Sequence, residues 1–203
     1  MATSRPVKTI SAFKSQLVGG GARPNLFEVD MATLPEGISW PKPASDGMQF
    51  LCKAATLPAS NIAQIDIPFR GRIFKVAGDR TVEPWSITVI NDENFLIRNA
   101  MEQWVEKMAK LSNNIGNVNP EAYMVTASVF QLGRGSNAGT AGNKAVDAGS
   151  ENSVLKAYKF LDIFPTSVSA IDLSYDSSDA IEEFTVEFQV NSFEVISNAA
   201  SNG

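Results

Sequence analysis

The stretch EEFTVEFQVNSFEV, residues 182–195, contains the clearest strand pattern in the chain. Its apolar and polar residues alternate strictly: Phe184, Val186, Phe188 and Val190 are set against Thr185, Glu187, Gln189 and Asn191. A period of two is typical of a strand with one buried and one solvated face. The solvated face carries no basic residue, so it is compatible with the wall of a solvent channel as well as with ordinary outer surface.

Most of the remaining chain also reads as strands. Apolar alternation or short apolar runs predict them at NLFEVDM (25–31), MQFLCKAATL (48–57), EPWSITVI (83–90), AYMVTASVFQL (122–132), SVLKAYKFLDIF (153–164) and SVSAIDLSY (167–175). The segments IAQIDIPF (62–69) and GRIFKVA (71–77) predict an extended hairpin joined near Gly71, with AGDR (77–80) as a closing turn. The chain is therefore expected to be mainly β.

One amphipathic helix is predicted over residues 93–111. A stripe at three- and four-residue spacing would face the sheet and comprises Ile97, Ala100, Met101, Trp104, Val105, Met108 and Leu111. Two i,i+4 charge pairs lie on the other side, Arg98/Glu102 and Glu106/Lys110. Asn91 or Asp92 is the expected N-cap. A Met and Trp stripe is more often core than binding groove, so this helix is expected to cover one side of a sheet or barrel.

The composition weakens an enzymatic interpretation. The 203 residues include no histidine, which removes the usual proton-transfer residue and the commonest metal ligand. The single cysteine, Cys52, lies in an apolar run and is expected to be a small buried residue rather than a reactive thiol. We predict no catalytic residue, metal site or cofactor. The first 21 residues lack a signal-peptide core, and no window is long enough to span a membrane, so synthesis in a cytoplasm is expected.

Charge is distributed unevenly along the chain. Residues 160–203 contain eight carboxylates and no Lys or Arg, whereas the first 159 residues contain 17 basic against 14 acidic residues. The basic residues of FRGRIFKVAGDR (69–80) are Arg70, Arg72, Lys75 and Arg80. Both charged regions are compatible with ordinary solvated faces. Alternatively, the basic arm of one copy contacts the acidic surface of another and sets the register of self-association. Nucleic-acid binding is disfavoured, because the carboxylate-rich remainder repels phosphates.

Several segments combine into a family resemblance. ARPNLFEVDM (22–31), FLCKAATLPAS (50–60), KVAGDRTVEPWSITVINDENF (75–95) and FPTSVSAIDLSYDSSDAIEEFTVEFQV (164–190) resemble, in order and spacing, the tail tube proteins of T-even-like contractile-tailed bacteriophages. The similarity extends over residues 22–194, with insertions near residues 36–47 and in a Gly-rich segment. The implied organisation is a flexible extension (1–21), one β domain (22–196) with a flexible loop (133–152), and a disordered tail (197–203).

The resemblance implies a fold and a function. The implied fold is an antiparallel β-barrel or sandwich with one flanking amphipathic helix. The implied function is that of a non-enzymatic virion protein, assembled in the host cytoplasm, whose hexameric rings stack into a tube inside a contractile sheath. The implied partners are other copies of the chain, the sheath, baseplate, tail terminator and tape measure proteins, and double-stranded DNA passing through the lumen.

Two sets of residues carry site hypotheses within that family. The arm Ile62–Arg80 is expected to form contacts between subunits or rings through Arg70, Arg72, Ile73, Phe74, Lys75 and Arg80. The candidate lumen wall consists of Glu187, Gln189 and Asn191, because a carboxylate and neutral polar groups would not hold DNA phosphates. Two rivals remain open: the inner tube of a phage-derived contractile injection or type VI secretion system, and a monomeric β-sandwich binding module or enzyme.

Overall fold

The structure of the protein is a computed structural model that describes residues 8–17, 21–113, 115–133, 154–176 and 178–196. The predicted Gly-rich loop and disordered tail lie almost wholly outside these residues. Two compact units are present: residues 1–28, 129–158 and 195–203 form one, and residues 29–128 and 159–194 form the other. The second unit contains the main core.

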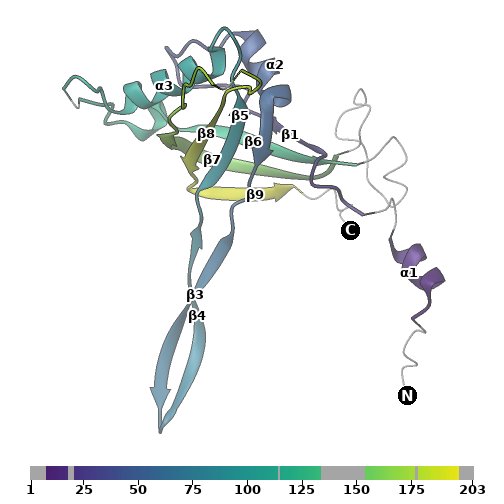
Figure 1. Cartoon of the computed structure of the whole chain (residues 1–203). Coiled ribbons are helices and arrows are strands. Elements are labelled where there is room, and N and C mark those ends of the chain that lie inside the picture. The colour runs from purple at the N-terminus through teal and green to yellow at the C-terminus, as the bar shows by residue number, and fades with distance from the viewer. Residues whose placement is uncertain (1–7, 18–20, 114, 134–153, 177, 197–203) are drawn as a thin grey trace, which may run out of the picture. The chain divides into compact units, whose positions relative to one another are not determined.

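Seven strands form one sheet (Figure 1). The order is β1-β6-β7-β8-β5-β2, and β9 pairs with β7. Their bounds are β1 Phe27–Asp30, β2 Cys52–Ala55, β5 Trp85–Ile90, β6 Val125–Leu132, β7 Val154–Val168, β8 Glu183–Gln189 and β9 Ser192–Ile196. Strands β3 (Ser60–Phe69) and β4 (Arg72–Val82) form a separate two-stranded sheet. The expectation of a mainly β, antiparallel fold is confirmed.

An aromatic cluster from three neighbouring strands forms the core of the larger unit. The ring centroid of Trp85 on β5 lies 4.8 Å from that of Phe160 on β7 and 5.2 Å from that of Phe188 on β8. Antiparallel pairing places Trp85 directly opposite Phe188, so the two rings share one face of the sheet. The predicted alternation is confirmed, because Phe184, Val186, Phe188 and Val190 are all buried.

Helices α2 (Lys42–Leu51) and α3 (Leu96–Met108) lie next to each other (Figure 1). The ring of Trp104 on α3 lies 5.9 Å from that of Phe188, and its indole Nε1 donates to the carbonyl of Tyr123 at 2.7 Å. Buried residues of α3 are Ile97, Ala100, Met101 and Trp104. This confirms that one side of the helix packs on the sheet.

The predicted limits of the α3 helix and of its apolar stripe were too wide. The helix is shorter than residues 93–111: Val105 in its last turns is exposed, and Leu111, also exposed, lies beyond its end at Met108. The predicted N-cap was wrong, because Phe95, in the left-handed region, occupies the N-cap position; the Asp92 Oδ1 accepts from the amide of Leu96, the first residue of the helix, at 3.1 Å. The Arg98–Glu102 pair is confirmed at 2.7 Å. Glu106 instead accepts from the amide of Leu111.

Two predicted strands were correct only in part, at residues 52–55 (β2) and 167–168 (the end of β7), and one predicted turn was wrong. Residues 48–51 belong to α2, where prolines at its first turn fit a helix start and Ala44 and Met48 bury one face at i,i+4 spacing. Strand β7 ends at Val168, so most of SVSAIDLSY is a loop. The AGDR segment is not a turn, because residues 77–80 lie within β4.

Cys52 has the environment that the sequence indicated. It is buried, and this burial raises the pKa of its thiol to about 12. A thiol with so high a pKa has almost no thiolate at neutral pH, so Cys52 acts as a small apolar residue of the core. Among the described residues, no cluster of three or more acidic, Cys or His side chains could hold a metal, and no helix is long and apolar enough to cross a membrane.

The smaller unit is held by backbone and side-chain contacts of β6. The Gln131 side chain donates to the carbonyls of Arg23 and Leu26, at 2.7 Å in each case. The amide of Leu132 also donates to the carbonyl of Leu26. This unit includes a short helix α1 (Ile10–Gln16), capped by the Thr9 hydroxyl, inside the N-terminal extension, for which the sequence predicted no secondary structure.

The aromatic cluster generates a stability prediction. Phe188→Ala should lower the free energy of unfolding of the monomer by about 3–5 kcal/mol, since it leaves a cavity beside Trp85 and Trp104. Phe50→Ala, at a residue that is 83% exposed, is the matched control and should change it by less than about 0.5 kcal/mol. Urea unfolding followed by tryptophan fluorescence measures both. Equal losses in the two variants would contradict this account of the core.

Candidate assembly surfaces

The β3–β4 hairpin is closed by a two-residue turn of Arg70 and Gly71. Phe69 pairs with Arg72 across it, and both turn residues have positive φ, 45° and 81°. Positive φ at both central positions is the conformation of a type I′ turn, whose twist matches that of the flanking strands. Glycine adopts it without steric cost, whereas Arg70 is held there at some cost. The predicted junction near Gly71 is confirmed.

A β-bulge interrupts the hairpin about two-thirds of the way down from this turn. Ile62 pairs with Arg80 and Gln64 with Ala77, so Ala63 alone lies opposite the two residues Gly78 and Asp79. A side chain at Gly78 would crowd β3, because its Cβ would lie 3.1 Å from the carbonyl oxygen of Ala63. The extra residue in β4 moves Arg80 onto the face that carries Lys75, instead of the face of Arg72 and Phe74.

Both faces of the hairpin present apolar side chains to solvent. One face carries the cross-strand pairs Ile65/Val76 and Ile67/Phe74, and the other carries Pro68/Ile73. Phe69, Ile73 and Phe74 are 63–65% exposed. A two-stranded hairpin is at best marginally stable alone in water. Its exposed apolar residues therefore fit a surface that another protein covers.

The basic residues of the hairpin have few partners within the chain. The Lys75 Nζ donates to Gln64 Oε1 at 3.1 Å, and the Arg70 guanidinium lies 5.5 Å from the centroid of the Phe69 ring. Within the described part of the chain, Arg70, Arg72, Lys75 and Arg80 form no ion pair. The structure thus brings the predicted contact residues onto one hairpin, five of them near its tip and Arg80 below the bulge.

The solvated face of the central sheet is rich in hydroxyl groups. Glu187 on β8 lies opposite Ser86 on β5 and Ser167 on β7. The next row pairs Thr185 with Thr88, whose hydroxyl oxygens are 3.3 Å apart. Lys53 on β2 is bound to Glu183 on this face at 2.6 Å. The row through Glu187 is consequently polar and carries no unpaired cation in the described strands.

The three lumen candidates do not occupy equivalent positions. Glu187 is exposed in the middle of β8, and Gln189 is half-buried at its end opposite Phe164. Asn191 lies beyond β8, where its amide nitrogen donates to the carbonyl of Asp162 at 3.0 Å. Of the three, Glu187 is therefore the one surrounded by the hydroxyl rows of neighbouring strands.

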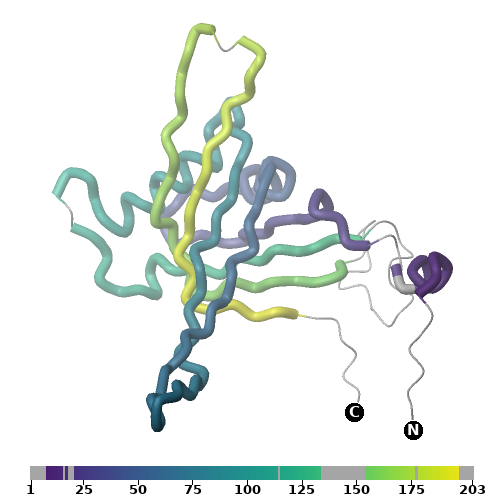
Figure 2. The backbone as a smooth tube through the Cα atoms, turned by 60° about the horizontal axis from the view of Figure 1, so that its bottom comes forward, coloured from purple at the N-terminus to yellow at the C-terminus, as the bar shows by residue number. Residues whose placement is uncertain are grey.

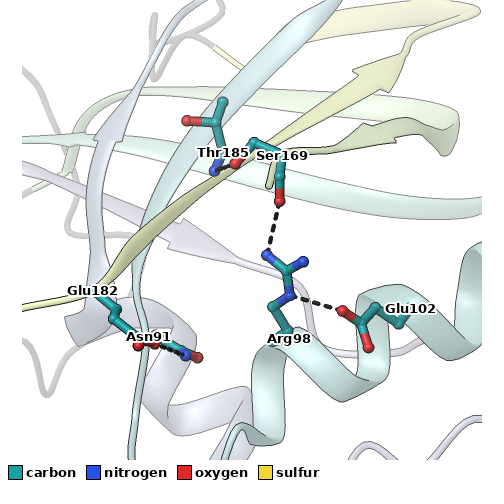
Figure 3. Close-up of polar contacts among 6 residues, drawn as sticks. All are labelled: Asn91, Arg98, Glu102, Ser169, Glu182 and Thr185. Atoms are coloured by element: carbon teal, nitrogen blue, oxygen red, sulfur yellow. Dashed lines mark hydrogen bonds and ion pairs between the residues drawn. The ribbon is translucent and has the colours of Figure 1, made fainter. Parts of the chain in front are cut away.

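A set of polar contacts at the other end of β8 holds the loop 169–182 at both of its ends (Figure 3). Arg98 Nη1 donates to the carbonyl of Ser169 at 2.9 Å, and the Thr185 amide donates to Ser169 Oγ at 2.9 Å. At the far end, the Asn91 amide and side chain donate to the backbone and carboxylate of Glu182, at 2.9 and 3.0 Å. We call these contacts the loop clasp. The sequence shows the Arg98/Glu102 spacing but gives no signal for the contact with Ser169.

The sequence of this chain is similar to that of known phage proteins. Residues 22–196 match the family described as phage tail tube protein. The chain belongs to this family. It is 32% identical over 183 residues to tail tube protein gp19 of Enterobacteria phage T4, covering 90% of this chain and 95% of that protein. The tail tube protein of Serratia phage KSP90 is 24% identical over 188 residues.

Solved structures with a similar fold come from contractile machines. The cap of the anti-feeding prophage matches with a TM-score of 0.54 and 17% identity, covering 97% of this chain and 95% of that one. A chain of the sheath-tube complex of an extracellular contractile injection system matches with a TM-score of 0.52 and 13% identity, covering 90% and 97%. At these identities the comparisons establish a shared fold. As a phage tail tube protein, the chain is a structural component of the virion tail.

The hairpin turn generates a prediction specific to this surface. Gly71→Val should reduce the protection of β3 and β4 amides from hydrogen exchange by roughly 5- to 30-fold, because an L side chain at this φ costs about 1–2 kcal/mol. The melting temperature should stay unchanged, since the hairpin contributes nothing to the aromatic core. Arg70→Asn is the control, because Asn tolerates this conformation. A large drop in melting temperature for Gly71→Val would show that hairpin and core unfold together.

Proposed function

We propose that copies of this chain form hexameric rings that stack into a hollow tube, with the β3–β4 hairpin making the contacts between subunits. The observation that carries the proposal is a hairpin with exposed aromatic and aliphatic residues and with basic groups that form no ion pair among the described residues. Apolar residues of this kind supply most of the binding free energy when covered, at about 1.5–3 kcal/mol for each fully buried side chain. Charged groups around them set orientation and exclude wrong partners.

The tube would work within a contractile tail. Membership of the phage tail tube family and the fold shared with chains of a tube-terminating cap and of a sheath-tube complex support this role. The proposed partners are the sheath, baseplate, tail terminator and tape measure proteins. A tube of this kind would carry double-stranded DNA and needs no catalytic residue. The clear sequence relatives are phage proteins, which favours the phage tail over the tube of an injection or secretion system.

The hydroxyl-rich face of β5, β8 and β7 is the proposed lumen wall. DNA binds proteins chiefly through lysine and arginine contacts to phosphates, so a channel for rapid passage should lack free cations. Glu187, flanked by Ser86 and Ser167, meets that requirement. Because Lys53 is already bound to Glu183, it offers a phosphate little attraction. The face would be wetted by water through its hydroxyls and would repel the DNA backbone weakly.

The hairpin assignment is tested by reversing its tip charges. Arg70→Glu/Arg72→Glu should abolish tubes at ordinary salt while leaving the circular dichroism spectrum and the melting temperature unchanged. Lys42→Glu/Lys110→Glu, which makes the same charge change at exposed positions on the helices' side, is the control and should still assemble. Negative-stain electron microscopy measures tube formation. Tubes of normal length from the hairpin variant would disprove the assignment.

The lumen assignment is tested in the assembled phage. Glu187→Lys should slow DNA ejection severalfold, because a cation on the wall attracts phosphates at every ring. Glu187→Gln removes the carboxylate without adding a cation and should leave the rate within about twofold. Ejection kinetics, followed by DNA-dye fluorescence after receptor or denaturant triggering, measure both. An unchanged rate for Glu187→Lys removes this face from the lumen.

A further inference from the structure

The described residues of the loop 169–182 present an acidic and apolar surface to solvent. Its described residues include Asp172, Asp176 and Asp179 and no Lys or Arg. Leu173 and Ile181 are 81% and 71% exposed, and Tyr175 is fully exposed. Exposed apolar residues interleaved with charges of one sign are typical of an interaction surface rather than of a purely solvating segment.

The loop clasp keeps this surface in place. Ser169 and Glu182, at the two ends of the loop, receive hydrogen bonds from Arg98, Thr185 and Asn91 (Figure 3). Arg98 is further held by Glu102 and by the Phe184 ring, whose centroid lies 5.2 Å from its guanidinium carbon. A loop with both ends fixed loses less conformational entropy on binding than a free one. The clasp therefore preorganises the loop for a partner.

The sheet places the acidic loop and the basic hairpin at opposite ends of one strand pair. Trp85, just after β4, pairs with Phe188, whereas Ile90 pairs with Glu183, just after the loop. The hairpin thus leaves from the Trp85 end of the β5–β8 ladder and the loop from the Ile90 end, as Figure 2 also shows. Two complementary surfaces at opposite ends of one subunit form a head-to-tail contact, which repeats without closing when the copies are stacked.

We propose that the acidic loop of one copy is the docking surface for the β3–β4 hairpin of a copy in the adjacent ring. The hairpin brings four basic residues against two carboxylates, Asp66 and Asp79, while the loop brings carboxylates alone. Phe69, Ile73 and Phe74 on the hairpin find apolar counterparts in Leu173, Tyr175 and Ile181. The inference rests on the proposed function, since it names the partner of the hairpin within the tube.

Three charge variants of the full chain test the pairing. The first is the loop variant Asp172→Lys/Asp176→Lys/Asp179→Lys, and the second is the hairpin variant Arg70→Glu/Arg72→Glu/Lys75→Glu. Each alone places like charges against each other and should raise the critical concentration for tube assembly at least about tenfold. The third variant carries all six substitutions, which restores opposite charges with the roles exchanged. It should assemble within about threefold of the wild-type concentration.

Two controls make the test specific to the loop. Asp46→Lys/Glu93→Lys/Glu121→Lys makes the same charge change at exposed carboxylates outside the loop and should leave assembly unchanged. Asp172→Asn/Asp176→Asn/Asp179→Asn removes charge with minimal change in shape, so it tests the same contact if the lysine variant does not fold. Sedimentation and electron microscopy measure assembly, and thermal unfolding checks the fold.

The outcomes separate this inference from the proposed function. If the hairpin variant fails to assemble but the loop variants assemble normally, the hairpin contacts another surface and the inference is wrong, while the proposed function stands. If the hairpin variant also assembles, both are wrong. Equal loss of assembly in the control outside the loop, or no rescue by the six-substitution variant, likewise overturns the docking of hairpin on loop.

Discussion

The packing of Trp85 against Phe160 and Phe188 is the interaction on which the rest of this structure depends. These rings hold β7, β8 and β5 side by side and provide the surface on which Trp104 anchors α3. The cluster lies on one face of the sheet, so the opposite face is free to carry Ser86, Thr88 and Thr185. Burial of one face therefore determines the polarity of the other. The hairpin and the acidic loop extend from the two ends of the same ladder without weakening it.

Sequence periodicity predicted the elements whose pattern is set by that core. Strict alternation at residues 184–190 and three- and four-residue spacing through Trp104 were read correctly, because burial imposes those periods. The hairpin turn at Gly71 was also predictable from local chemistry. Prediction was wrong where a short apolar run suited two structures: residues 48–51 look like a strand but continue a helix that begins at a proline-rich turn. Both ends of α3 were predicted three residues too far out, because the apolar spacing continues beyond the residues that form the helix.

The candidate sites were predictable in part. The basic residues of the hairpin are adjacent in sequence, so local pattern was sufficient to group them. The clasp was not predictable, because Arg98 and Ser169 are 71 positions apart and meet only after β8 pairs with β5. For the lumen face, alternation marked Glu187 correctly as exposed. The same alternation did not predict that Asn191 lies beyond the end of β8, where it donates a hydrogen bond to the backbone carbonyl of Asp162.

The bulge at Gly78 gives the hairpin a property that its composition does not reveal. Side chains along a strand alternate between its two faces. One extra residue in β4 therefore reverses the face on which each β4 residue nearer the tip lies, relative to the β4 residues between the bulge and β5. Strand β3 alternates without interruption, so the pairs near the tip would be the same without the extra residue, and only the facing of Arg80 and of the residues below it would change. The length of β4, rather than its chemistry, therefore decides that Arg80 shares a face with Lys75. A single insertion or deletion in β4 would redistribute basic charge between the two faces of the hairpin without replacing any basic residue.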